Sequence, residues 1–135
     1  MPRTTLTFAA LVVVQAAHSV EEYVGRLWES FPPATFVSRL ISDDLRRGFA
    51  IGNIVLVAFG LWCVLVPVRR RWPSATGLMW IWIVIETING IGHSLWALRR
   101  GGYTPGVATA PILLCLALYL AWQLNQADNA PSRSG

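Results

Sequence analysis

The sequence predicts an all-α fold, a four-helix transmembrane bundle. Hydrophobic residues make up 54% of its 135 residues and charged residues only 13%, against roughly 25% charged residues in soluble domains. Four apolar runs, each close to the ~20 residues of a bilayer span, are separated by polar connections rich in turn residues. We therefore expect a single four-span domain over residues 1–125 and a disordered polar tail at 126–135.

The first run covers residues 6–24 and ends in the sequence His-Ser-Val-Glu-Glu at 18–22. It reaches the length of a span only if this polar cluster is included, so we expect the cluster to complete the helix. In one alternative the cluster lies among lipid headgroups. In another, the N-terminus is a cleaved secretory signal, because Arg3 precedes the apolar run and residues 14–16 loosely resemble a small-residue cleavage site. Cleavage would leave three spans.

A connection rich in proline and charge follows at residues 25–44. Four of its apolar residues form one helical stripe, opposite Ser38 and Arg39, which predicts a short helix at the membrane interface. A plain surface loop is the alternative. The stripe consists of Phe36, Val37, Leu40 and Ile41.

The second run covers residues 49–68 and contains one strongly polar residue, Asn53. Asp43 or Asp44 is expected to cap the start of this helix. Gly48 and Gly52 are four residues apart, a spacing that allows another helix to approach closely. Three arginines and two prolines then form a tight basic turn around residues 67–73.

The third run, residues 75–98, is the most polar of the four because it contains Glu86, Asn89 and His93. A Gly- and Pro-rich segment at 101–106 predicts a turn, and the fourth run extends over residues 107–124. We expect the loop from Tyr103 to Pro111 to cover the polar residues, since it enters the fourth helix on the side where the third one ends.

Four spans place both termini and the arginine turn on one side of the cell membrane. The positive-inside rule then favours the cytoplasm for that side. All eleven basic residues are arginines dispersed between apolar runs, which argues against nucleic acid as a partner. Cys63 and Cys115 lie within apolar runs, so no disulfide framework is expected.

The intramembrane polar residues are predicted to lie at similar depth. At ~1.5 Å per residue, His18 and Glu22 are about 21 and 27 Å along the first helix, while Glu86 and His93 are about 16 and 27 Å along the third. A carboxylate within hydrocarbon costs at least ~2.5 kcal/mol. These groups are therefore expected to meet, to bind a cation or to line a polar cavity.

Imidazole and carboxylate together suit zinc, iron or manganese, and helical bundles build such centres from inward-facing side chains. We therefore expect an intramembrane divalent-metal centre in an enzyme that acts on a lipophilic substrate. Residue roles are expected as follows: metal ligands His18, Glu22, Glu86 and His93; catalytic groups Glu21, Glu86 and Asn89; substrate-lining groups Asn53, Tyr103 and Trp82.

The motifs support a family resemblance. The chain resembles the bacterial integral membrane proteins of unknown function named for their H-x-x-E-E motif, through His18, Glu21 and Glu22 and then through Asn89 and His93. Tyr103, Pro105 and Gly106 follow in the same order. The resemblance implies a small multi-pass membrane protein and supplies no reaction.

Two other functions remain open at this level. A metal-free acid/base isomerase or cyclase would use a desolvated glutamate as proton carrier. A proton- or ion-coupled carrier would use the same groups as a relay, and four helices would then require a homo-oligomer. For Glu86 alone, a structural salt bridge or hydrogen bond is a further alternative. Membrane lipids are expected as partners in every case.

Overall fold

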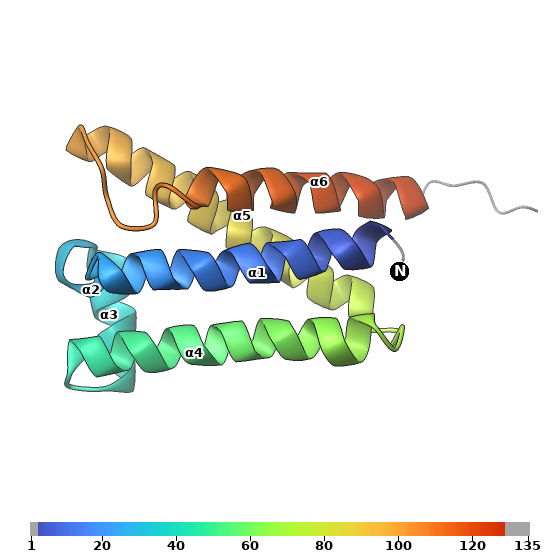
Figure 1. The fold of residues 1–135 in the computed structure, drawn as a ribbon, viewed down its shortest axis with the longest axis horizontal. Helices are drawn as coiled ribbons and strands as arrows, with labels where there is room; N and C mark the ends of the chain where they lie inside the picture. Colours follow the sequence, from blue (N-terminus) through green and yellow to red (C-terminus); the bar gives the residue numbers. More distant parts are fainter. Residues whose placement is uncertain (1–2, 129–135) are drawn as a thin grey trace, which may run out of the picture.

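The computed structural model describes residues 3–128, and all the regular structure in that range is helical. This confirms the predicted all-α class. Four long helices form a bundle, and shorter elements lie at its ends (Figure 1). The elements are α1 (Arg3–Val24), α2 (Leu27–Ser30), α3 (Pro32–Ile41), α4 (Leu45–Cys63), the π-helical turn η1 (Val64–Val68), α5 (Ala75–Arg100) and α6 (Ala110–Asp128).

In Figure 1, α1 lies between α4 and α6 and runs antiparallel to both, while α5 crosses the bundle at an angle. Helix α6 packs against both α1 and α5, and α4 packs against α1. The start of α1 and the end of α6 consequently lie at the same end of the bundle.

Three segments are long and apolar enough to cross a membrane, namely Leu45–Val68, Ala75–Arg100 and Ala110–Ala127. These agree with the second, third and fourth predicted runs. Helix α1 has 22 residues, but its glutamine, histidine and two glutamates lower its mean hydropathy, so it is not among them. The length and composition of these three helices are consistent with membrane localisation.

The long helices expose large apolar side chains and bury some ionisable ones, which is unlike a soluble protein. Val20, Ile54 and Ile88, from three different long helices, are 62–67% exposed, whereas the side chains of His18 and Glu86 are fully buried. Soluble proteins bury large apolar residues and almost never fully bury unpaired charged ones. Exposed apolar side chains combined with buried ionisable ones are the arrangement expected for helices surrounded by lipid.

The main apolar core lies toward the N-terminal end of α1, away from the polar residues. Trp82 is fully buried there, with its ring centroid 6.3 Å from that of Phe8. Gly60 permits this packing, because a Cβ at that position would lie 3.0 Å from the Trp82 ring. Trp82, which the sequence suggested as substrate-lining, therefore packs in the core.

The predicted short helix is present as α3, and it starts earlier than the apolar stripe, at Pro32. Its backbone at Ser38 contacts Gly48 of α4 so closely that a side chain at Gly48 would clash with it, as the glycine spacing predicted. Ser38 is buried against α4, whereas Phe36 and Leu40 are 65% and 71% exposed. The apolar stripe of α3 thus points outward.

The ends of α4 and α6 show where the sequence located a helix boundary correctly and where it did not. The Asp44 side chain caps α4 by accepting a hydrogen bond from the Arg47 amide at 3.1 Å, as expected. Helix α6 begins at Ala110 instead of residue 107, because the preceding amides bond to a side chain of α1. It continues to Asp128, so the predicted disordered tail is helical at 126–128. The rest of that tail, residues 129–135, lies outside the described residues.

Candidate metal centre

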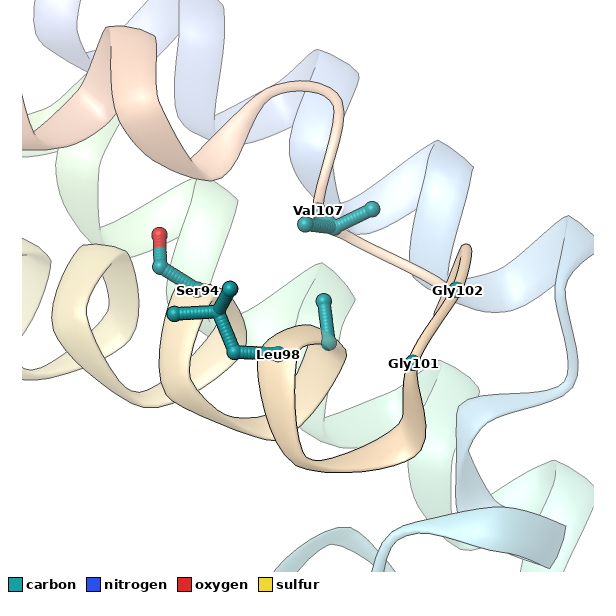
Figure 2. Close-up of a pocket in the computed structure, with 6 residues that line it drawn as sticks. Ser94, Leu98, Gly101, Gly102 and Val107 are labelled. Carbon is teal, nitrogen blue, oxygen red and sulfur yellow. The ribbon is translucent and has the colours of Figure 1, made fainter.

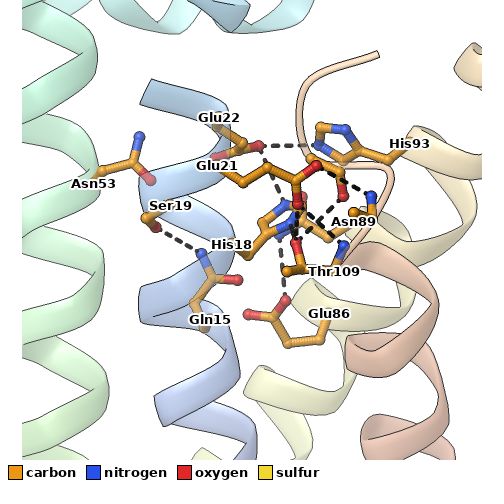
Figure 3. A network of polar contacts seen from close by, with 12 residues as sticks. Gln15, His18, Ser19, Glu21, Glu22, Asn53, Glu86, Asn89, His93 and Thr109 are labelled. Atoms are coloured by element: carbon orange, nitrogen blue, oxygen red, sulfur yellow. Dashed lines mark hydrogen bonds and ion pairs between the residues drawn. The ribbon is translucent and has the colours of Figure 1, made fainter. Parts of the chain in front are cut away.

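Two imidazoles converge on one carboxylate oxygen inside the bundle. The Oε1 atom of Glu22 lies 3.2 Å from Nε2 of His18 and 3.0 Å from Nε2 of His93 (Figure 3). All three residues are buried, with 0%, 7% and 4% of their surface exposed. One potential ligand atom from each lies within 4.8 Å of the others. Among the described residues, His18, Glu22 and His93 are the one group of at least three His, Cys, Asp or Glu side chains that could hold a metal ion.

Helical spacing explains how α1 contributes two members of this group. His18 and Glu22 are four residues apart, so their side chains project from the same face of α1 on successive turns. His93 comes from α5, and its ring packs edge-on against that of His18 with centroids 4.8 Å apart. The similar depth predicted from sequence for these residues is therefore observed.

Glu21 faces a different neighbour, the loop before α6. Its carboxylate accepts hydrogen bonds from the Ala108 and Thr109 amides, both at 3.1 Å, and from the Tyr103 hydroxyl at 2.9 Å. The Thr109 hydroxyl donates to the same carboxylate at 2.6 Å. Glu21 thus fastens the loop to α1 and supplies the partners that delay the start of α6.

The loop connects Glu21 back to the candidate centre through Thr109. Nδ1 of His18 lies 2.6 Å from the Thr109 hydroxyl oxygen. Because that hydroxyl donates its proton to Glu21, it accepts from His18, so Nδ1 of His18 carries the proton. In a neutral imidazole the lone pair is then on Nε2, the atom that faces Glu22. This nitrogen is buried, and it lies 3.2 Å from Oε1 of Glu22.

Gly106 covers both imidazoles. Its φ of +92° is in the region that favours glycine. A Cβ there would lie 2.6 Å from Cε1 of His93 and 2.8 Å from Cε1 of His18, so a side chain cannot be accommodated without movement. Glycine is required here by both conformation and space. The prediction that this loop covers the polar residues agrees with the structure.

Tyr103 covers the centre less directly than the sequence suggested. It is 68% exposed, and its hydroxyl donates a hydrogen bond to Glu21. Partial desolvation, together with the Glu21 carboxylate, raises the pKa of Tyr103. Its hydroxyl therefore stays protonated and acts as the donor.

Glu86 lies apart from the three converging residues. It is seven residues before His93, about 10.5 Å along α5, and is not part of their group. The Asn89 amide donates to its carboxylate at 3.3 Å. With the Gln15 amide nitrogen turned toward Glu86, Gln15 donates to both carboxylate oxygens, at 3.1 and 2.9 Å, and accepts from Ser19. The structure therefore brings together three of the four expected ligands.

A pocket of about 360 Å³ opens beside the centre, between α1, α3, α4 and α5. Asn53, predicted to line the substrate site, is part of its wall, while Tyr103 and Trp82 are not. Glu22, Asn89 and His93 line the same pocket. A separate pocket lies between the end of α5 and the following loop (Figure 2). It is lined by Ser94, Ala97, Leu98, Gly101, Gly102 and Val107, none of them an expected site residue.

Sequence reasoning did not assign roles to two residues of this network. Gln15 lies three residues before His18 and so shares its helix face, a signal that was available. Thr109 had no comparable signal, because its contacts with His18 and Glu21 span 91 and 88 residues of sequence. Its role follows only from the fold.

Comparison with known proteins agrees with the motif. Residues 9–120 match the family described as "Protein of unknown function with HXXEE motif". No curated protein and no solved structure matches the chain. The matched range includes every residue of the network described above and most of the chain. The chain therefore belongs to the family of proteins of unknown function with an HXXEE motif.

Proposed function

We propose that this chain is a multi-pass membrane enzyme in which His18, Glu22 and His93 bind one divalent metal ion, and that it acts on a lipophilic substrate. Zinc, iron and manganese are the candidate ions. The observation that carries the proposal is the convergence of two buried imidazole nitrogens on one carboxylate oxygen, at 3.2 and 3.0 Å.

The two nitrogen–oxygen separations suit neighbouring ligands of one ion. Ligand atoms at ~2.0–2.2 Å from a metal lie roughly 3.0–3.5 Å apart when they are neighbours in a tetrahedral or octahedral site. Two histidines and one carboxylate form the ligand set of several zinc hydrolases and of non-haem iron oxygenases. Three protein ligands also leave a position for water or substrate.

The protonation of His18 supports the same assignment. Thr109 and Glu21 hold the proton on Nδ1, which leaves the Nε2 lone pair facing the Glu22 carboxylate. A lone pair facing an anionic oxygen is repulsive unless a cation or a proton lies between them. Metal-ligating histidines generally donate their other N–H to a partner that fixes the tautomer, and Thr109 is positioned to be that partner.

The chemistry divides between the ion and the chain. A bound metal would polarise a carbonyl or lower the pKa of a bound water. Glu86 and Asn89 are the candidate groups for moving a proton and orienting a substrate, because Asn89 lines the pocket and bonds to the Glu86 carboxylate. Glu21, with four hydrogen bonds to the loop, acts as a positioning residue.

Membrane insertion is proposed to include α1 as a fourth span. Val13 and Val20 of α1 are 65% and 62% exposed, whereas Gln15 and His18 on its other face are buried. That distribution matches the one on the three helices that are long and apolar enough to span. The fourth span would then cover the polar centre on the side of α1.

A metal-free acid/base enzyme is the second candidate. It is favoured by one observation, that Glu22 already lies within ion-pair distance of both imidazoles. A protonated imidazole would satisfy the carboxylate without a metal. The pocket and Glu86 would serve such an enzyme in the same way, so metal content decides between the two.

Elemental analysis of the protein purified in detergent tests the proposal. We expect about one equivalent of zinc, iron or manganese in the wild type. His18→Ala and His93→Ala should each lose it. Glu29→Ala is the matched control, because Glu29 is an exposed residue of α2 whose ion pair with Arg26 is at the surface, and it should retain the metal.

A folded wild-type protein that takes up none of the three metals, even after titration with each, would contradict the metal centre. The acid/base alternative would then predict that Glu86→Gln removes activity and leaves the thermal denaturation of the protein unchanged.

A further inference from the structure

The pocket beside the centre has an apolar wall and a polar inner end. The wall is formed mainly by α3 and the first half of α4. Its larger apolar lining residues are Leu27, Phe31, Val37, Ile41, Phe49 and Leu56. Polar groups gather where α1 and α5 approach, and they include Glu22, Asn89 and His93.

Exposure changes along this lining. Val37 and Ile41 on α3 are 53% and 43% exposed, while Glu22 and His93 are 7% and 4% exposed. The pocket therefore extends from an apolar surface of the molecule to the buried centre. Phe36 and Leu40 continue that apolar surface on α3, so a ligand would enter from lipid and not from water.

The size and charge of the pocket restrict its occupant. The pocket volume of about 360 Å³ is at the low end of the ~300–1,000 Å³ of small-molecule pockets, so it suits one small ligand better than a two-chain phospholipid. The lining contains no arginine to pair with a phosphate, whereas amide, imidazole and carboxylate groups suit a small oxygen-bearing head group.

We propose that this pocket binds the hydrocarbon chain of a single-chain amphiphile, such as a medium-chain alcohol, aldehyde, acid or ester, with its head group at Glu22, Asn89 and His93. The chain lies along α3 and α4, and the head group is the reacting end. This inference rests on the proposed function for the identity of the reacting end, because Glu22 and His93 line the pocket together with residues outside the metal group.

Photolabelling of the full chain in phospholipid vesicles tests the inference. The probe is a medium-chain fatty alcohol that carries a diazirine on its hydrocarbon chain. We expect saturable labelling of α3 and of the first half of α4, around Val37 and Phe49. An excess of the unlabelled alcohol should prevent it, even though phospholipid is present in large excess.

Two variants on α3 make the result specific. Val37→Trp narrows the pocket and should weaken labelling by about tenfold or more, the discrimination that one misfitting group produces in an apolar pocket. Leu40→Trp adds the same side chain on the same helix but outside the pocket lining, and it should label like the wild type. Competition by the unlabelled alcohol needs no variant, so a misfolded Val37→Trp protein would not remove the test.

Labelling that does not saturate, or that is equal in both variants and spread over all exposed helices, would overturn the inference. The experiment is done with metal-loaded and with chelator-treated protein. A wild-type protein that labels saturably but takes up none of the three metals on titration would support the pocket and contradict the metal centre. Metal binding without saturable labelling would support the metal centre and contradict the amphiphile pocket.

Discussion

Nδ1 of His18 lies 2.6 Å from the hydroxyl oxygen of Thr109, although 91 residues separate the two. The same hydroxyl donates to Glu21, three residues after His18 on α1. The two glutamates of the motif thus have different partners. Glu22 faces the imidazole nitrogens, whereas Glu21 acts on His18 through the loop before α6.

The first prediction concerns Thr109. Thr109→Val keeps the shape of the side chain but removes the hydroxyl that fixes the proton of His18. We expect metal affinity to fall about 10- to 100-fold, as is typical when an outer partner of a ligand is lost. A chelator competition titration measures the change. Thr109→Ser, which restores the hydroxyl, should recover most of the affinity, and equal affinities for the Val and Ser variants would contradict this role.

The second prediction concerns Gly106. Gly106→Ala places a methyl group 2.6 Å from His93 Cε1 at a φ of +92°. The backbone penalty alone is roughly 1–2 kcal/mol, so we expect a lower thermal midpoint and weaker metal binding. Gly102→Ala is the control, because a Cβ at Gly102 contacts nothing within 4 Å. If the two variants behave alike, the loop does not pack on the imidazoles as described.

The features of the fold and the site that follow from regular helix geometry were predictable from the sequence. The pairing of His18 with Glu22 follows from helical spacing, and the cap by Asp44 and the close approach at Gly48 are also local. Comparing depths along the first and third helices was enough to place His93 near His18. These features follow from helix geometry, which is the same in any fold.

Long-range contacts could not be predicted in this way. Sequence spacing does not reveal that Thr109 links Glu21 to His18, because the path of the loop decides it. Glu86 was expected to join the ligands because it shares a helix face with His93. Two helical turns separate Glu86 from His93, so Glu86 lies beside Gln15 instead. There its buried carboxylate accepts hydrogen bonds from Gln15 and Asn89.

The third prediction concerns membrane topology. If α1 crosses the membrane, reporters fused before residue 1 and after residue 135 should lie on the same side, and the short arginine turn favours the cytoplasm for that side. A reporter inserted within residues 101–105 should lie on the opposite side. With only the three most apolar helices crossing, the two ends would lie on different sides, and that result would exclude the fourth span.

The last prediction concerns Gln15 and Glu86, which are 1% and 0% exposed. Gln15→Leu removes the donors that face both Glu86 oxygens and leaves a buried carboxyl group with Asn89 alone. Losing one partner of a buried polar pair costs ~1–3 kcal/mol, whereas replacing both partners by apolar groups is nearly neutral. We therefore expect Gln15→Leu to destabilise the protein in a detergent unfolding titration, and adding Glu86→Leu to recover most of that loss. Additive destabilisation in the double variant would show that the two side chains do not interact, and Gln15 would then have to bond elsewhere.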